Sequence, residues 1–198
     1  MEYNMKALTF VLSVLFFTYS FIAHAQINPL LNYDWWRDAT PQKVEMVIKK
    51  GLNANANYGH ATPLTTAAHF NSNPRNFEIL IENGADVNAK LNSGITALMV
   101  AIIQNPNPEV IKTLIKYGAD VNAKDSYGMT PLLWASAKTN SSEVVESLIE
   151  NGADINVTHN GKTLLDYAGK NRYLKGIERR RVLKILKRRN IGEKRPLK

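Results

Sequence analysis

The chain has 198 residues, 44% of them hydrophobic and 21% charged, which suits a single domain with a continuous core. It contains no cysteine, so disulfide bonds, thiolate catalysis and cysteine-based zinc sites are excluded. The formal net charge of +8 is unevenly spread: residues 170–198 hold 13 Lys and Arg against 2 Asp and Glu, whereas residues 26–169 hold 11 against 14. The body is therefore mildly acidic and the C-terminal end strongly basic.

The first 25 residues have the pattern of a signal peptide. Lys6 supplies a positive charge, residues 8–17 form an apolar run, and Ala-His-Ala at 23–25 is a small-x-small cleavage signature. We expect cleavage before Gln26 and export, to a periplasm or out of the cell. The alternative is an uncleaved anchor helix. Polar residues within 7–25 disfavour it, because a membrane span needs about 20 predominantly apolar residues.

Two landmarks recur along the chain with one period. The first is Asn-Gly-Ala-Asp-Val-Asn-Ala-Lys at residues 83–90, which returns at 117–124 and 151–157 and, in a diverged form, at 50–56. Its glycines are 33, 34 and 34 residues apart. The second landmark is a threonine that opens an apolar stretch, spaced by 34, 34 and 33 residues, at Thr62, Thr96, Thr130 and Thr163. Two independent landmarks with one period indicate an array of structural repeats.

The Thr-Pro-Leu opening and the Gly-Ala-Asp-Val-Asn-Ala ending of these units resemble the ankyrin repeat family. The resemblance implies an all-α solenoid of helix–turn–helix repeats of 33–34 residues with β-hairpin-like fingers, an N-terminal half-repeat and a C-terminal capping repeat. An array of this kind behind a secretory leader resembles an exported bacterial protein. We expect an extended lead-in at residues 26–33, an array over 34–190 and a basic disordered tail at 191–198. The expected units of the array are residues 34–56, 57–90, 91–124, 125–158 and 159–190.

Capping residues predict where the helices begin. A threonine N-cap precedes each expected inner helix, at residues 63–70, 97–104 and 131–138. The sequence also departs from the family pattern, because Thr65, Met99 and Leu133 stand where the family has a histidine. In the first finger, moreover, His60 occupies the place of the turn glycine. We expect both differences to alter local bonds or shape and to leave the fold intact.

The tryptophans are expected to pack rather than to bind ligands. Trp35 and Trp36 could form an exposed aromatic platform, but such residues more often cover the end of a repeat stack. Trp134 falls within an inner helix, at a position that is mostly buried between repeats. We therefore expect Trp36 and Trp35 in an N-terminal cap and Trp134 in the core.

The resemblance implies a protein partner, of unknown identity, on the concave face that the finger tips and the inner-helix edges form. The family's contact positions, carried over residue by residue, predict partner contacts at Tyr58, His60, His69, Phe70, Ile95, Ile103, Tyr127, Met129, Lys138 and Lys162. Aromatic residues and methionine favour interface cores, although some of these side chains could instead pack between neighbouring fingers.

The C-terminal helix, expected over about 176–190, offers a second surface. Its predicted apolar face, with Ile177 and Val182, closes the stack, and a predicted basic face lies opposite. That basic face comprises Arg179, Arg180, Arg181, Lys184, Lys187, Arg188 and Arg189. It could be a solvated cap, or it could adhere to an anionic membrane or a polyanion.

No chemistry is predicted. The chain past the leader has three histidines, His60, His69 and His159, and no recognisable hydrolase, metalloprotease or phosphate-loop motif. The recurring Asp and Asn residues are expected to shape the finger turns. We expect no catalytic residue, no metal site, no cofactor and no small-molecule substrate.

Overall fold

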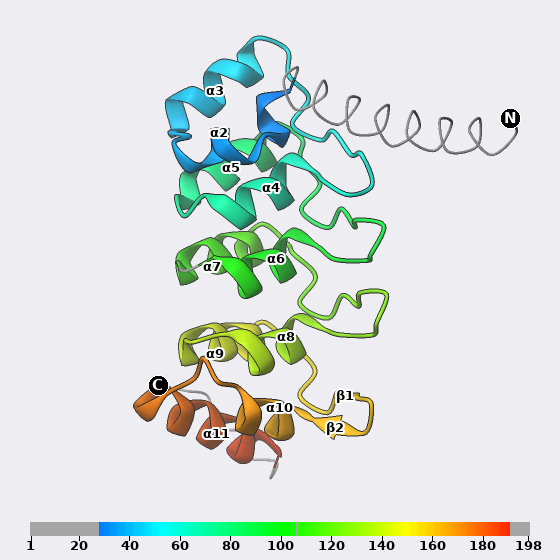
Figure 1. Ribbon diagram of the computed structural model, residues 1–198, viewed down its shortest axis with the longest axis vertical. Coiled ribbons are helices and arrows are strands. Elements are labelled where there is room, and N and C mark those ends of the chain that lie inside the picture. Colours follow the sequence, from blue (N-terminus) through cyan, green and yellow to red (C-terminus); the bar gives the residue numbers. More distant parts are fainter. Residues whose placement is uncertain (1–27, 106, 191–198) are drawn as a thin grey trace, which may run out of the picture.

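The computed structural model describes residues 28–105 and 107–190, apart from the side chains of 189 and 190. Helix pairs stack on one another along the long axis of the molecule, and the loops between successive pairs project to one side (Figure 1). Within the described residues there are ten α-helices and a single two-stranded hairpin. The predicted all-α repeat solenoid is confirmed. The predicted signal peptide (1–25) and basic tail (191–198) lie outside the described residues.

Each repeat contributes an inner and an outer helix. An N-terminal unit contains the 3₁₀ turn η1 (Pro29–Leu31), α2 (Tyr33–Arg37) and α3 (Pro41–Lys49). The first, second and third repeats follow as α4 (Pro63–Phe70) with α5 (Pro74–Glu82), α6 (Ala97–Gln104) with α7 (Pro108–Lys116), and α8 (Pro131–Lys138) with α9 (Ser142–Glu150). The capping repeat contains β1 (Thr158–His159), β2 (Lys162–Thr163), α10 (Leu164–Lys170) and α11 (Gly176–Asn190). The three inner helices have the bounds that the capping residues predict.

Threonine caps fix the inner-helix starts. The Thr62 hydroxyl accepts a hydrogen bond from the Thr65 N–H at 3.1 Å, and Thr65 Oγ1 accepts one from the Thr62 N–H at 2.9 Å. Thr163 and Asp166 form the same reciprocal capping box in the last repeat, and these bonds lower the pKa of the Asp166 carboxyl. Thr65 thus supplies a bond where the family has a histidine, whereas Met99 is simply buried.

The N-terminal unit closes the stack with a tryptophan. Trp36 is fully buried, and its Nε1 donates to the Leu30 carbonyl at 2.8 Å. Trp35 packs edge-on against Trp36 and is partly buried, so the predicted cap is confirmed. The predicted extended lead-in is wrong for its described part, because η1 turns the chain so that Leu30 and Leu31 join the buried side chains.

The repeated Asp and Asn residues couple one repeat to the next. Asp86 Oδ1 accepts from the Asn88 N–H within the same turn, at 2.8 Å. Asn88 then reaches the following repeat, where its Oδ1 accepts from the Asp120 N–H at 2.7 Å and its Nδ2 donates to the Gly118 carbonyl at 2.9 Å. Asn122 repeats this pattern one step later. The turn residues therefore also tie the repeats together.

The fingers differ in length and regularity. In the first finger the Tyr58 N–H donates to the Ala61 carbonyl and Gly59 takes the positive φ of +78°, so the turn is a residue tighter than in the second finger. His60 is thus spared the left-handed conformation. The last finger is the β1–β2 hairpin, whose central residues Asn160 and Gly161 have φ of +49° and +69°. Two positive φ angles at an Asn-Gly pair are typical of a type I′ turn.

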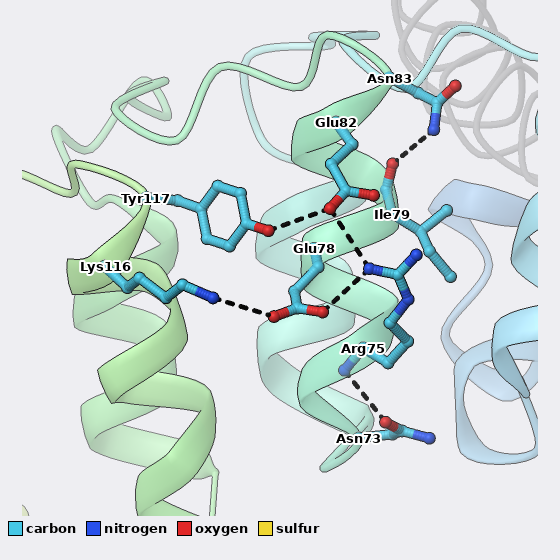
Figure 2. Close-up of polar contacts among 8 residues, drawn as sticks. All are labelled: Asn73, Arg75, Glu78, Ile79, Glu82, Asn83, Lys116 and Tyr117. Atoms are coloured by element: carbon cyan, nitrogen blue, oxygen red, sulfur yellow. Dashed lines mark hydrogen bonds and ion pairs between the residues drawn. The ribbon is translucent and has the colours of Figure 1, made fainter.

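Charged side chains link the outer helices of the first and second repeats. Figure 2 shows Arg75 donating to Glu78 and Glu82 within α5, at 3.0 and 3.2 Å. From α7, Lys116 pairs with Glu78 at 3.6 Å and the adjacent Tyr117 hydroxyl donates to Glu82 at 3.0 Å. The Arg75 guanidinium lowers the pKa of the Glu78 carboxyl. This network joins the first and second repeats.

Candidate functional site

The finger residues of the predicted partner site are mostly accessible. Tyr127 is the most exposed of the large hydrophobic side chains, at 75%, and Tyr58 is 43% exposed. His60 and Lys162 are exposed as well, whereas Ile95 is half-buried. These residues belong to the segments between successive helix pairs, which project from the stack (Figure 1).

Met129 does not belong to an accessible surface. Its side chain is 6% exposed and belongs to the hydrophobic core. The Met129 N–H donates to Asp125 Oδ1, and Asp125 Oδ2 accepts from Trp134 Nε1, at 2.9 and 3.0 Å. Asp125 thus fixes the base of the finger through two hydrogen bonds, with the Met129 side chain turned toward the core. The prediction that Met129 contacts a partner is wrong. Trp134, expected in the core, is half-buried and packs against the core.

His69 and Phe70, at the end of α4, are part of an aromatic cluster with Tyr33. The ring centroids of His69 and Phe70 are 4.1 Å apart, and those of Tyr33 and Phe70 are 4.9 Å apart. Arg37 places its guanidinium carbon 5.8 Å from the Phe70 ring centroid. His69, Tyr33 and Arg37 are exposed and Phe70 is half-buried. We call these four residues the aromatic cluster.

Ile103 and Lys138 lie together on a groove between the second and third repeats. The groove has a volume of about 350 Å³ and runs between the C-terminal ends of α6 and α8. Tyr173, which follows α10 and is 47% exposed, forms part of its rim. Lys138 Nζ and Arg172 Cζ each lie 5.7 Å from the Tyr173 ring centroid.

The predicted partner residues therefore occupy two edges rather than one strip. Tyr58, Tyr127 and the other finger residues precede the inner helices, whereas Phe70, Ile103 and Lys138 stand at their C-terminal ends. An eight-residue helix separates the two edges by about 12 Å. A large partner can touch both edges, but each edge forms its own contact surface.

Sequence reasoning missed two aromatic residues of the helix-end edge. Tyr33 falls in the expected lead-in and Tyr173 precedes the expected C-terminal helix, so neither stands at a contact position that the family resemblance predicts. Both follow an asparagine that bonds the backbone nearby: Asn32 Oδ1 accepts from the Trp35 N–H, and Asn171 Oδ1 accepts from the Tyr173 N–H. Asparagines that fold the chain in this way could have marked these positions as ordered.

The basic face of α11 is only partly as predicted. Arg180, Lys184, Lys187 and Arg188 are exposed, and Arg181 pairs with Glu178 at 3.2 Å. Two assignments are wrong. Arg179 is half-buried and donates from Nη2 to the Asn171 carbonyl at 2.6 Å, so it holds the loop before α11 rather than facing solvent. Ile177, expected on the buried stripe, is 60% exposed. The side chain of Arg189 lies outside the described part.

No group of three metal-ligating side chains is found in residues 28–105 and 107–190. Over the same ranges, no helix is both long enough and apolar enough to cross a membrane.

Comparison with known proteins identifies the repeats. A family model described as ankyrin repeats (3 copies) matches residues 64–159 and, in a second overlapping match, residues 98–179. No curated protein was found to match the sequence. The two matches together extend over more than half of the chain and fall on the stacked helix pairs. Ankyrin repeats are generally protein–protein interaction modules. The chain belongs to the ankyrin repeat family.

Proposed function

We propose that this protein is a non-catalytic module that binds a protein partner across its fingers and inner-helix ends. The aromatic cluster of Tyr33, Arg37, His69 and Phe70 carries this proposal. Three closely spaced aromatic rings and a guanidinium lie at an accessible edge, and aromatic residues and arginine are enriched in the cores of protein interfaces.

The cluster is also well held, which favours binding. Phe70 packs against the core, and Asn71, directly after it, donates to the Trp36 and Ala39 carbonyls at 2.8 and 3.0 Å. A rigid anchor loses little side-chain entropy on association. Exposed Tyr127 and Tyr58 in the fingers extend the surface for a larger partner.

Cross-linked affinity capture tests this proposal with His69→Ala and Phe70→Ala. A partner captured by the wild-type protein should be lost from both variants at about 0.15 M salt, and wild-type capture should persist at about 0.5 M salt because apolar contacts are not screened. Met46→Ala removes an exposed methionine from outer helix α3 and is the matched control. A partner retained by His69→Ala and Phe70→Ala would overturn the assignment of the site.

A second candidate function is electrostatic adhesion to an anionic membrane or polyanion through α11. It is favoured by Arg180, Lys184, Lys187 and Arg188, which are exposed and form no ion pair within the described residues. Binding to vesicles with anionic lipid should then disappear in an Arg180→Glu, Lys184→Glu, Arg188→Glu variant and weaken with salt. Equal binding to neutral vesicles would contradict adhesion by charge.

Export is the third part of the proposal, and it rests on the leader pattern of residues 1–25. Cleavage would release a chain that begins at Gln26, in a periplasm or outside the cell. Mass spectrometry of the protein recovered from its natural source gives the mass of the mature chain. An intact N-terminal methionine would argue against cleavage.

A further inference from the structure

Carboxamide side chains at the ends of the inner helices join successive repeats. Asn71 follows α4, and its Nδ2 donates to the carbonyls of Trp36 and Ala39 in the preceding unit, at 2.8 and 3.0 Å. Asn105 follows α6, and its Nδ2 donates to the carbonyls of Ala68 and Asn71, at 3.1 and 2.8 Å. At each junction one amide group satisfies two carbonyls that are three residues apart.

The junction between the second and third repeats lacks this amide. Asn171 resumes the pattern after α10 and donates to Ser136 and Thr139, at 3.0 and 2.9 Å. The corresponding position after α8 is Thr139 itself, whose side chain is too short to reach back. Asn105 donates to Ala68 and Asn71, and the equivalent residues one repeat later are Ile102 and Asn105. An asparagine at position 139 would therefore donate to the Ile102 and Asn105 carbonyls.

No hydrogen bond to either carbonyl is found among the described residues, and the Asn105 N–H donates to the Ala101 carbonyl instead. The Ile102 carbonyl would ordinarily accept from the N–H four residues later, but residue 106 is a proline, which has none. Thr139 Oγ1 is engaged as an acceptor from the Ser141 N–H, at 3.2 Å. Two backbone acceptors at a repeat junction are therefore open to a donor from outside.

The open carbonyls belong to residues that line the groove of about 350 Å³. Ile102, Ile111 and Val144 are buried and give the groove an apolar floor. Its volume lies near the lower end of the range for ligand-binding clefts. The missing amide thus coincides with a space that can accept a few side chains.

The rim of the groove is positively charged. Lys138 and Arg172 flank the Tyr173 ring, each with its cationic centre 5.7 Å from the ring centroid. Neither cation pairs with a carboxylate in the part of the chain that the structure describes. These two cations would repel a lysine or arginine of a partner. The hydrogen-bond donor that suits the open carbonyls is therefore an uncharged group, and an acidic side chain next to it would be attracted to the rim.

We propose that an extended segment of a protein partner binds in this groove. A side-chain carboxamide of the segment donates to the carbonyls of Ile102 and Asn105, in place of the absent asparagine, and a nearby carboxylate pairs with Lys138 and Arg172. The inference rests on the proposed function. It specifies which partner groups would bind at the inner-helix-end edge of this protein.

Thr139→Asn tests the groove directly. The new side chain should donate to the two open carbonyls, raise the urea midpoint of unfolding and fill the place of the partner's amide. Lys138→Gln is a second variant that leaves the groove open and removes one rim charge. Met46→Ala is the control at a distant exposed site.

The probe is the peptide acetyl-Val-Asn-Val-Glu-Val-amide, titrated against the full-length protein with the backbone amide signals of Tyr173 and Ser141 followed by NMR. A matched peptide with Asp in place of Asn, which accepts where a donor is needed, should bind about 10-fold more weakly or not at all. Thr139→Asn should abolish binding of the Asn peptide. Lys138→Gln should weaken that binding about 2- to 5-fold, and should leave binding of a Gln-for-Glu peptide unchanged.

The groove and the proposed function fail in different ways. Equal binding of the Asn and Asp peptides, undiminished binding to Thr139→Asn, or no shift of the two signals at about 5 mM peptide would overturn the groove proposal. Peptide binding that follows these variants, together with a captured partner that Phe70→Ala and His69→Ala still retain, would instead uphold the groove and refute the aromatic cluster as the partner site.

Discussion

Glu178 of the capping repeat closes the N-terminus of the preceding outer helix. Its Oε2 accepts a hydrogen bond from the Ser142 N–H, the first residue of α9, at 2.7 Å. The residue before α9, Ser141, forms no side-chain cap, unlike Asn73 and Asn107 before the other two outer helices. The last repeat therefore covers the stack and also supplies a hydrogen bond that the third repeat lacks.

Replacing Glu178 by alanine should destabilise the C-terminal half of the array. The loss is expected to be about 1 kcal/mol, the usual effect of removing an N-terminal helix cap. Urea unfolding followed by circular dichroism measures it. Glu45→Ala is the control, because its carboxylate forms only a distant ion pair with Lys49, at 3.9 Å; it should change stability by less than half as much. Equal losses of stability in Glu178→Ala and Glu45→Ala would mean that the hydrogen bond to Ser142 does not stabilise the fold.

Stability should also fall in acid, partly through Glu178. The Ser142 N–H holds the pKa of the Glu178 carboxyl below its usual value, so the unfolded chain binds the proton more readily. The contribution is complete above the unfolded pKa of about 4.3 and is lost as the pH falls through the folded pKa. Urea midpoints measured from about pH 6 to pH 3 should decline less steeply in Glu178→Gln. Parallel profiles would contradict this assignment.

Replacing the Asn171 carboxamide should destabilise the protein more than replacing most other polar side chains. It is 2% exposed, donates to Ser136 and Thr139, and accepts from the Tyr173 N–H at 2.8 Å. Asn171→Ala leaves buried carbonyls without a donor, which costs about 1–3 kcal/mol for such a group. Asn140→Ala, at an exposed position, is the control and should be nearly neutral in a thermal melt.

Most of the fold follows from local sequence signals. The inner helices could be bounded because threonine caps and proline at the first turn act within a few residues, as at Thr62 and Pro63. The burial of Met129 was missed because it depends on Asp125 and Trp134, which clamp the finger base through contacts that no period reveals. Arg179 was assigned to the basic face by helical spacing, yet a carbonyl from the preceding loop draws it inward.

The candidate site was harder to predict than the fold. Ile103 and Lys138 could be selected from their places in the repeats, but the groove that they line lies at the junction where Thr139 stands in place of an asparagine. The missing amide at Thr139 can be recognised only from the structure, in which asparagines at the equivalent positions of the other junctions donate to the preceding unit. The aromatic cluster similarly needs Tyr33, from a segment that carries no repeat signal.

Trp36→Phe tests the N-terminal cap. Phenylalanine is smaller than the fully buried indole, so the change leaves a cavity, and the Leu30 carbonyl also loses the indole donor that lies 2.8 Å away. The unpaired carbonyl alone should cost about 1–3 kcal/mol, and the cavity adds to this loss. Hydrogen exchange should localise the loss to α2 and α4. A uniform loss of protection along the array would argue against a distinct cap.

Close packing of the fingers can be separated from backbone strain by comparing two glycines. Gly84 and Gly94 both have positive φ, +91° and +74°, so alanine is strained at either site by about 1–2 kcal/mol. At Gly84 a Cβ would meet nothing within 4 Å, whereas at Gly94 it would lie 2.8 Å from the Ser126 backbone nitrogen. That nitrogen donates to the Ser93 carbonyl at 2.9 Å, so the two fingers cannot easily move apart.

Gly94→Ala should therefore be less stable than Gly84→Ala by a further ~1–2 kcal/mol, the cost of an overpacked contact. Urea unfolding of the two variants measures the difference. Equal losses would show that the fingers separate freely, and that the finger edge adapts to its partner instead of presenting a fixed surface.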